Sequence, residues 1–188
     1  FRLIDYEGEN SDFYMSTYEL TQNDYNNGAS AWMAEQSIFP AEINKQQCET
    51  YINDLNNSFP YIFKIPNNTE WEYAAGKNIY TNEMYVYPWG NDIESNNANY
   101  FNSDYPLSFS GSNGPSPVGY FITFPSPFGL YDMSGNVMEW VDGGGNTIVG
   151  KGGNYYSGVD ELRIDYIEES VLENTSSAMG CRVILEIN

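Results

Sequence analysis

The alternation of apolar and polar positions predicts a few short elements in the first third of the chain. Residues 13–19 mix aromatic and β-branched side chains, as strands do. Apolar positions recur every three or four residues over 43–56, which predicts an amphipathic helix with Cys48 on or beside its buried face. Residues 61–66 are typical of a short strand that ends at Pro66.

Helix-capping residues mark two helix starts. Thr21 precedes an acidic residue three positions later, and the short helix that it opens is expected to stop at Gly28. Asn67 and Glu70 have the spacing of a capping box, which opens a helix over 71–75. Helices interleaved with short strands in this way favour an α+β domain.

The rest of the chain has little periodicity. Residues 78–127 are rich in Asn, Ser, Gly, Pro and Tyr, and a loop region of that length is either functional or held by something other than regular ladders, such as bound ions. Short strands are predicted over 147–149 and 163–167, with a terminal strand over 181–187. No repeat or linker is visible, so residues 1–188 are expected to form one domain.

Charge excludes several classes of function. The 188 residues carry 26 Asp and Glu against 7 Lys and Arg, a net charge of −19, and no His. Nucleic acids and anionic membranes attract Lys and Arg, so neither is an expected partner. Without His there is no Ser-His-Asp triad and no His-held zinc or iron. No run of about 18 apolar residues occurs, so membrane insertion is not expected.

The acidic, Asn-rich composition has two interpretations. Ca²⁺ takes roughly six to eight oxygen ligands from carboxylates, amides and carbonyls. An acidic surface also simply keeps a protein soluble. Aromatic residues make up 16% of the chain and hydrophobic residues 41%, enough for a folded core. Cys48 and Cys181 allow one long-range disulfide, and the alternative is two small buried hydrophobes.

Short motifs occur in order from residue 64 to residue 182. They are K-I-P-N-N-T-E-W-E-Y-A-A at 64–75, Y-P-W-G-N at 87–91, A-N-Y at 98–100, P-F-G-L-Y-D-M-S-G-N-V-M-E-W at 127–140, K-G-G-N-Y at 151–155 and G-C-R at 180–182. In this order they resemble the blocks of the formylglycine-generating enzyme (sulfatase-modifying factor) family. The resemblance implies an α+β fold, the formylglycine-generating-enzyme variant of the C-type lectin fold. It has two main helices, small twisted antiparallel sheets and much irregular structure.

The resemblance also argues against catalysis. Oxygen-dependent members hold copper through two cysteines in the segment after the block R-G-G-S-W, because soft thiolates select Cu(I). Ser157 and Leu162 stand at those positions, so no copper is expected and the chain is predicted not to be an enzyme. A branch of the family that forms C–S bonds uses iron held by His, which the chain lacks. A residual oxidase is the weakest alternative.

The family places a calcium ion near the segment G-N-x-x-E. The implied ligands are Gly135, Asn136, Val137 and Glu139. An amide, a carboxylate and turn carbonyls are hard oxygen donors within short reach of one another. The alternative is that Glu139 pairs with Arg163 or Arg182 while Asn136 caps a turn.

A second ion site of the family uses the Asn of A-N-Y, the next carbonyl and a downstream Asp. Asn99 and Tyr100 match the first two, whereas Ser110 stands near the Asp position and Asp104 is the replacement considered. The family also sometimes ties its termini with a disulfide. In this chain such a bridge would join the first long helix to the last strand.

The function that this resemblance implies is binding or display. The fold tolerates extreme variation between R-G-G-S-W and G-F-R, a property used by receptor-binding proteins of phages and bacteria. That segment is 154–179 here. The expected ligand-binding residues are Tyr155, Tyr156, Ser157, Val159, Asp160, Glu161 and Leu162. We expect a protein or glycan ligand and an extracellular or virion-surface location. The alternative is a structural subunit of a virion or filament whose neighbours bury this face.

Overall fold

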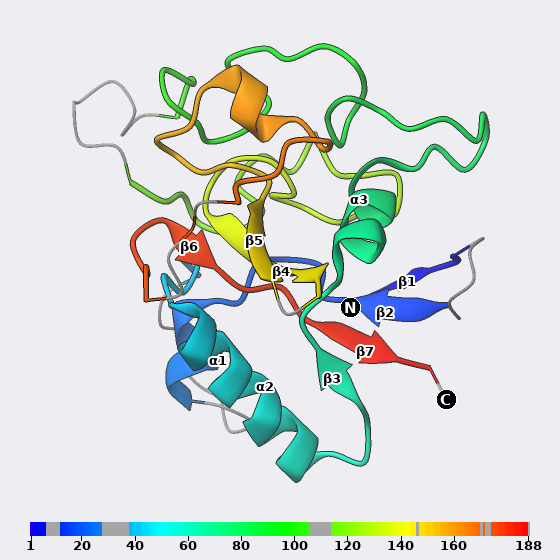
Figure 1. Ribbon diagram of the computed structural model, residues 1–188. Coiled ribbons are helices and arrows are strands. Elements are labelled where there is room, and N and C mark those ends of the chain that lie inside the picture. The colour runs from blue at the N-terminus through cyan, green and yellow to red at the C-terminus, as the bar shows by residue number, and fades with distance from the viewer. Residues whose placement is uncertain are drawn as a thin grey trace.

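The computed structural model describes residues 1–6, 12–27, 38–105, 114–145, 147–169, 171 and 174–187. Within these ranges the helical elements are α1 (Gln22–Asn27), α2 (Lys45–Ser58), α3 (Asn68–Gly76) and the 3-10 turn η2 (Val159–Leu162). The strands are β1 (Arg2–Ile4), β2 (Phe13–Met15), β3 (Phe63–Lys64), β4 (Met138–Gly144), β5 (Thr147–Lys151), β6 (Met179–Gly180) and β7 (Ile184–Glu186) (Figure 1). The predicted α+β class is confirmed.

The strands form two small sheets. The first has the order β1-β2-β7-β3 and is antiparallel throughout. The second has the order β5-β4-β6, and its β4–β6 pair is parallel. The expectation of purely antiparallel sheets was therefore wrong for this pair. After β5 the chain passes through η2 and returns as β6, which lies beside β4 and runs in the same direction. Parallel neighbouring strands need a long connection of this kind.

The helix starts were predictable because side chains cap them. The Asn67 amide oxygen accepts a hydrogen bond from the Glu70 backbone at 2.9 Å, and the Glu70 carboxylate accepts one from the Asn67 backbone at 2.9 Å. Asn44 and Gln47 make the same reciprocal pair at the start of α2. The Thr21 hydroxyl caps α1. Each cap satisfies backbone groups that the first helical turn leaves unpaired.

Two strand predictions failed, for different reasons. Residues 163–167 form turns instead of a strand, with the Tyr166 amide donating to the Arg163 carbonyl at 3.1 Å. No strand is predicted over β4, which the structure contains. The first four residues of β4 are all buried, so the strand lacks the in-and-out alternation that identifies a strand by sequence.

The disulfide is present. Cys48 of α2 and Cys181, which directly follows β6, are bonded across 133 residues of chain. Both are fully buried in a cluster that also holds Ile43, Ile52 and Trp140. A covalent link that closes a loop of this length restricts the unfolded chain and is worth about 2–5 kcal/mol. Of the two interpretations of the cysteines, the bridge is the one that the structure contains.

Asparagine has a structural use in the irregular region. Residues 77–105 and 114–137 contain no helix or strand. The backbone at Asn82, Asn102 and Asn136 has positive φ, 59°, 66° and 62°, a conformation that Asn tolerates better than most residues. The Asn78 side chain accepts hydrogen bonds from the backbone of residues 80 and 81. Asn therefore supplies turns where ladders are absent. In the described residues no helix is long and apolar enough to cross a membrane.

Candidate functional site

An ion pair lies at the centre of the predicted calcium site. Glu139 of β4 and Arg182 are both fully buried. The Arg182 Nη2 is 2.8 Å from Glu139 Oε1, and its Nε donates to both carboxylate oxygens at 2.9 and 3.1 Å. The Trp71 indole of α3 donates to Oε2 at 2.7 Å. Both oxygens of Glu139 are thus committed to protein donors.

The contacts of Glu139 favour the ion-pair interpretation over the ion-ligand interpretation. A guanidinium within hydrogen-bonding distance already supplies the positive charge that the carboxylate needs, and a calcium ion beside it would be repelled. Between the two interpretations of this carboxylate, the contacts match pairing with Arg182. Arg163 pairs instead with Asp165, 2.8 Å away on the surface.

Asn136, the other side chain implied as a ligand, is also engaged. Its Oδ1 accepts from the Ser116 amide at 2.7 Å, and its Nδ2 donates to Glu19 at 2.6 Å. The Val137 amide donates to the other oxygen of Glu19 at 3.0 Å. The Asn136 amide donates to the Asn99 carbonyl at 2.8 Å. These bonds make Asn136 a cross-link between distant segments as well as a turn residue.

The two predicted ion sites are neighbours. Gly135 has φ 81°, and a Cβ there would fall on the Asn99 carbonyl oxygen, so only glycine lets these segments approach so closely. Asn99 is buried, and its Nδ2 donates to the Gly114 carbonyl at 2.9 Å. Among the residues that the structure describes, its Oδ1 has no hydrogen-bond partner. A buried acceptor left without a partner costs about 1–3 kcal/mol.

The remaining residues of the second site are placed less favourably for a cation. The Tyr100 carbonyl accepts from the Ser103 amide at 3.0 Å. Asp104 is exposed and accepts from the Ser95 hydroxyl at 2.7 Å. Ser110 lies outside the described residues. Across the described ranges no three Asp, Glu, Cys or His side chains cluster as metal ligands. Asn99 Oδ1 is therefore the atom here that most clearly fits a cation.

The carboxylates of Glu19, Asp132 and Glu139 all interact electrostatically with the Arg182 guanidinium. Glu19 is buried, and burial raises its pKa well above the usual value, with the nearby charges of Asp132 and Glu139 adding to the shift. Burial also raises the pKa of Asp132 to about 6, although the Gly119 amide and Arg182 act in the opposite direction. Sequence reasoning missed Glu19. It stands alone before α1 and no motif marks it as buried.

The predicted ligand-binding face is only partly exposed. Tyr156 is 55% and Val159 40% exposed, Asp160 is exposed and Glu161 is half-buried. Tyr155, Ser157 and Leu162 are buried, so the expectation that these three form the exposed face was wrong.

Each of the three buried residues has an inward contact. Tyr155 packs with Val137 and donates its hydroxyl to Glu42 at 2.8 Å. Leu162 packs among the Tyr87, Ala98 and Tyr100 side chains. The Ser157 hydroxyl accepts from the Asn154 amide at 3.1 Å. These residues anchor the segment, and its exposed residues lie between them.

Neither cysteine of the chain has a free thiol that could bind copper. The positions that the resemblance assigns to the copper cysteines are the buried Ser157 and Leu162. The chain has two cysteines, and both are in the disulfide. A Cu(I) site built on thiolates therefore has no ligands in this chain.

Replacing Glu139 by Gln should lower the free energy of unfolding by about 3–5 kcal/mol, because Arg182 would then be a buried charge without a counter-charge. Urea unfolding followed by tryptophan fluorescence measures the change. Asp165→Asn is the matched control, since it breaks an exposed arginine pair and should have little effect. A loss below about 1 kcal/mol for the Glu139 variant would contradict the role given to the pair.

Asp132→Asn should stabilise the protein by about 1–3 kcal/mol near pH 7.5, with the gain shrinking as the pH falls below about 6 and disappearing near pH 3.8. The folded-state pKa, about 6, exceeds the ordinary 3.8, so the folded state binds the proton more tightly. Stability from this group is present at low pH and is lost as pH rises through about 6. Asn keeps the hydrogen-bond acceptor and tolerates the φ of 57°.

The measurement is the urea midpoint at several pH values for both proteins. Because many other carboxylates titrate in this range, the quantity that matters is the difference between variant and parent. A difference that does not change between pH 5 and 7.5 would show that Asp132 titrates normally.

The chain is similar to a known protein family and to several of its members. The family model for the sulfatase-modifying factor enzyme 1-like domain matches residues 7–187. Inactive C-alpha-formylglycine-generating enzyme 2 of Bos taurus is 38% identical over 80 residues, covering 41% of this chain and 25% of that protein. Formylglycine-generating enzyme of Mus musculus is 32% identical over 83 residues, covering 41% and 21%. The aligned part thus spans a quarter or less of these relatives.

Solved structures agree on the fold. Treponema denticola variable protein 1 has a TM-score of 0.71 at 18% identity, with 98% of this chain and 91% of that chain covered. PvdO from Pseudomonas aeruginosa has a TM-score of 0.72 at 20% identity, with 94% and 81% covered. At such identities the likeness shows the fold alone. With the matched family model, the ordered motifs and this fold, the chain belongs to the sulfatase-modifying factor enzyme 1-like (formylglycine-generating enzyme) domain family.

Proposed function

We propose that this chain is a non-catalytic binding or display module of a virion or cell surface. The observation that carries the proposal is that both cysteines of the chain are bonded to each other, while the positions that the resemblance assigns to the copper cysteines hold the buried Ser157 and Leu162. Relatives named as inactive formylglycine-generating enzymes, 38% identical over the matched segment, support it. A fold kept without its redox ligands is suited to recognition.

The proposed recognition surface consists of Tyr156, Val159, Asp160 and Glu161, and is called the η2 face. Its backbone is held in place from within. The Tyr156 amide donates to the Asn154 side chain at 2.9 Å, and the Gly158 amide donates to the Glu161 carboxylate at 2.7 Å.

The buried residues of the same segment stabilise this arrangement. Tyr155 and Leu162 anchor it at both ends. A surface ordered before binding loses little conformational entropy when a ligand arrives. Tyr156 adds a large exposed ring with a hydroxyl, a side chain enriched where proteins contact partners. The proposed ligand is a protein or a glycan.

The second candidate function is structural. In a virion or extracellular filament, the same exposed side chains would pack against a neighbouring subunit, and no receptor would reach them. The two functions differ in whether the η2 face is accessible in the native assembly.

We also propose one calcium ion beside Asn99. The observation that supports it is the buried Asn99 Oδ1, which has no partner among the described residues. The adjacent Tyr100 carbonyl, which already accepts from the Ser103 amide, is the second oxygen proposed as a ligand. Calcium accepts both donor types. When bound, the ion would neutralise negative charge and hold irregular chain that no ladder supports.

Calcium should raise the melting temperature of the protein relative to the same sample in a chelator. Asn99→Ala should abolish that difference, whereas Glu139→Asp should keep it, because Glu139 pairs with Arg182. Calorimetric scans with calcium, magnesium and chelator measure the shifts. Equal melting temperatures in all three would overturn the calcium proposal.

The double variant Tyr156→Ala with Val159→Ala should keep its stability to within about 0.5 kcal/mol, because both side chains are exposed. We expect it to lose at least about tenfold in binding to any hit of the parent on arrays of glycans and surface proteins. Tyr80→Ala, at an exposed tyrosine outside both proposed surfaces, is the control.

Accessibility in the native assembly decides between the two functions. Tyrosine nitration followed by peptide mass spectrometry should modify Tyr156 as readily as Tyr80, which is 92% exposed. Protection of Tyr156 in the assembly, but not in the isolated chain, would overturn the receptor-binding function and favour the structural one.

A further inference from the structure

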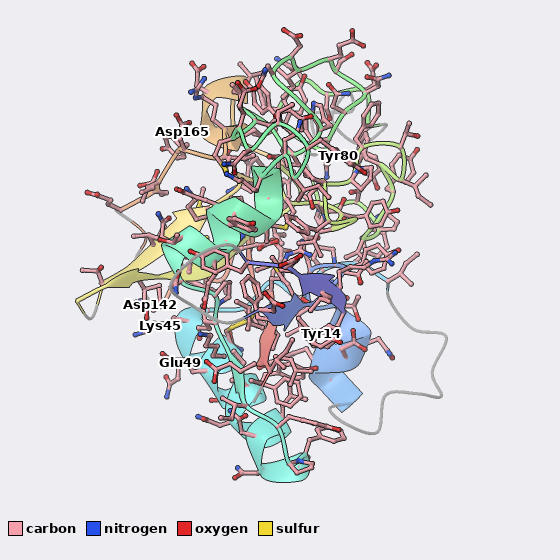
Figure 2. All side chains as sticks on the ribbon, turned by 90° about the vertical axis from the view of Figure 1, so that its right-hand side faces the viewer. Tyr14, Lys45, Glu49, Tyr80, Asp142 and Asp165 are labelled. Atoms are coloured by element: carbon pink, nitrogen blue, oxygen red, sulfur yellow. A yellow bond between two sulfur atoms is a disulfide. The ribbon has the colours of Figure 1, made fainter. Side chains whose placement is uncertain are left out.

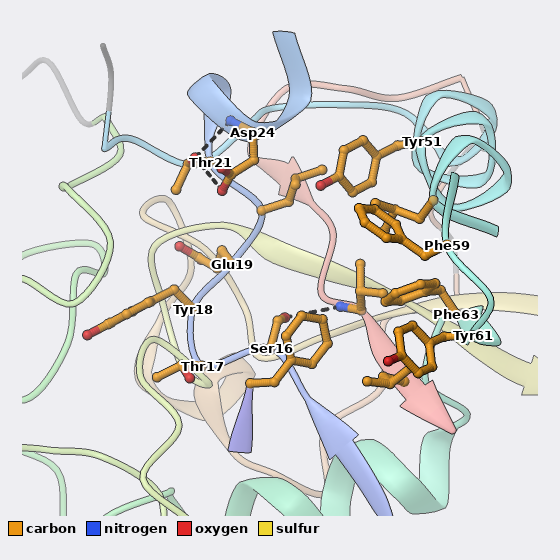
Figure 3. A pocket seen from close by; sticks show the side chains of 15 residues that line it. Ser16, Thr17, Tyr18, Glu19, Thr21, Asp24, Tyr51, Phe59, Tyr61 and Phe63 are labelled. Carbon is orange, nitrogen blue, oxygen red and sulfur yellow. Dashed lines mark hydrogen bonds between the residues drawn. The ribbon is translucent and has the colours of Figure 1, made fainter. Parts of the chain in front are cut away.

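A groove opens at the end of the molecule away from the η2 face. It lies between α2, the first sheet and the segment that precedes α1 (Figure 3). In Figure 1 the η2 turn, drawn in orange, lies at the top and α2 at the bottom. Figure 2 likewise shows Asp165 and Tyr80 in the upper part and Lys45 and Glu49 of α2 in the lower part. The groove has a volume of about 750 Å³, within the range of small-molecule sites.

Aromatic rings dominate the lining of this groove. The rings come from Phe1, Tyr18, Tyr51, Phe59, Tyr61 and Phe63. Phe63 is at their centre, with ring centroids 6.3 Å from Phe1, 6.3 Å from Phe59 and 6.5 Å from Tyr61. Phe1 and Tyr61 are each 55% exposed and Phe59 38%. Several rings gathered around one concavity and left open to water are typical of a binding surface.

The outer face of the sheet extends this apolar surface. Leu3, Tyr14, Leu185 and Phe63 are successive cross-strand partners, so their side chains form one row on one face. Leu3 is 47% and Tyr14 38% exposed. Core packing explains Phe63, which α2 covers, but not the exposed members of the row.

Of the two carboxylates that line the groove, only that of Asp24 is left to face a ligand, and the amino group of Phe1 belongs to the same lining. The acidic side chains that line it are Asp24 and Glu19, and no Lys or Arg side chain is among the described residues of the lining. Glu19 is directed inward to Asn136 and Val137. Asp24 is near Tyr51, whose pKa is raised to about 12 by burial and by the Asp24 charge. The net charge of −19 adds a field that attracts cations.

We propose that this groove binds an organic cation with an apolar body, in which an ammonium or guanidinium group lies over the tyrosine and phenylalanine rings near Asp24. Aromatic faces attract cations, and several rings around one site are the usual means of recognising alkylated ammonium groups. The apolar body packs against Leu55 and Val183. The site is separate from the η2 face and does not depend on it.

Benzyltrimethylammonium is the probe. Titrated into the isotope-labelled protein, it should shift the amide resonances of residues 16–24 and 51–63, with a dissociation constant of about millimolar, as expected for a fragment of this size. Neutral benzyl alcohol should bind more weakly, and the anion phenylacetate should produce no saturable shift. Equal response to all three probes would overturn the cationic class, and no saturable response to benzyltrimethylammonium would overturn the site.

Two variants localise the interaction. Tyr61→Ala removes an exposed ring, and Asp24→Asn removes the charge while keeping an acceptor for the Thr21 hydroxyl. Each should weaken benzyltrimethylammonium binding about two- to tenfold. Asp24→Asn should leave benzyl alcohol unaffected. Tyr156→Ala, equally exposed but on the η2 face, should bind all probes as the parent does. Unchanged binding by both groove variants, with spectra that show intact folds, would overturn the assignment.

The cation has two sources, a free small molecule or a basic side chain of a partner protein. A capped Leu-Arg-Leu tripeptide, compared with Leu-Gln-Leu, tests the second. Tighter binding of the arginine peptide than of benzyltrimethylammonium assigns the groove to a protein segment, and the reverse order assigns it to a free organic cation. If the glutamine peptide binds as well as the arginine peptide, the role of the charge is wrong.

Discussion

The buried pair of Glu139 and Arg182 is the interaction on which the other contacts of the domain depend. Arg182 uses its remaining donors on the carbonyls of Ser16 at 2.9 Å and Tyr131 at 2.7 Å, while Glu139 also accepts from Trp71. One pair of charges therefore connects β4, α3 and the segments that follow β2 and precede the G-N turn. Removing water from two charges is expensive, and only such complete hydrogen bonding offsets that cost.

Outside this ion pair, side-chain hydrogen bonds hold the irregular segments in place, as long strands do in more regular domains. Asn136 connects Glu19, Ser116 and the backbone of residue 99. Asn56 at the end of α2 bonds both the amide and the carbonyl of Phe63, at 2.7 and 3.0 Å, and so closes the free edge of β3. Such contacts position irregular chain firmly, so the surface of this fold does not depend on long strands for its order.

The two proposed binding surfaces differ in chemistry as well as in place. The η2 face combines one exposed tyrosine with acidic and small apolar side chains on a backbone anchored by Tyr155 and Leu162. The groove beside α2 is concave, aromatic and bordered by Asp24. A display module with one face for a partner and a separate groove for a cation can be tested one surface at a time, because the residues do not overlap.

The sequence by itself determined the family, the helix starts and the number of cysteines. Capping pairs such as Asn67 with Glu70 are local, since both partners lie within one helical turn, and the aligned positions of Ser157 and Leu162 depend on spacing alone. The short motifs could be matched for the same reason. None of these conclusions required contacts between distant residues.

Only the tertiary structure decided how the acidic residues are used. Glu139 is separated from Arg182 by 43 positions and Asn136 from Glu19 by 117, so no local pattern could choose between an ion ligand and an ion pair. Burial of Tyr155, Ser157 and Leu162 likewise follows from segments packed against them from elsewhere in the chain. The role of a carboxylate depends on the charged groups that folding brings close to it, and those groups can be distant from it in the sequence.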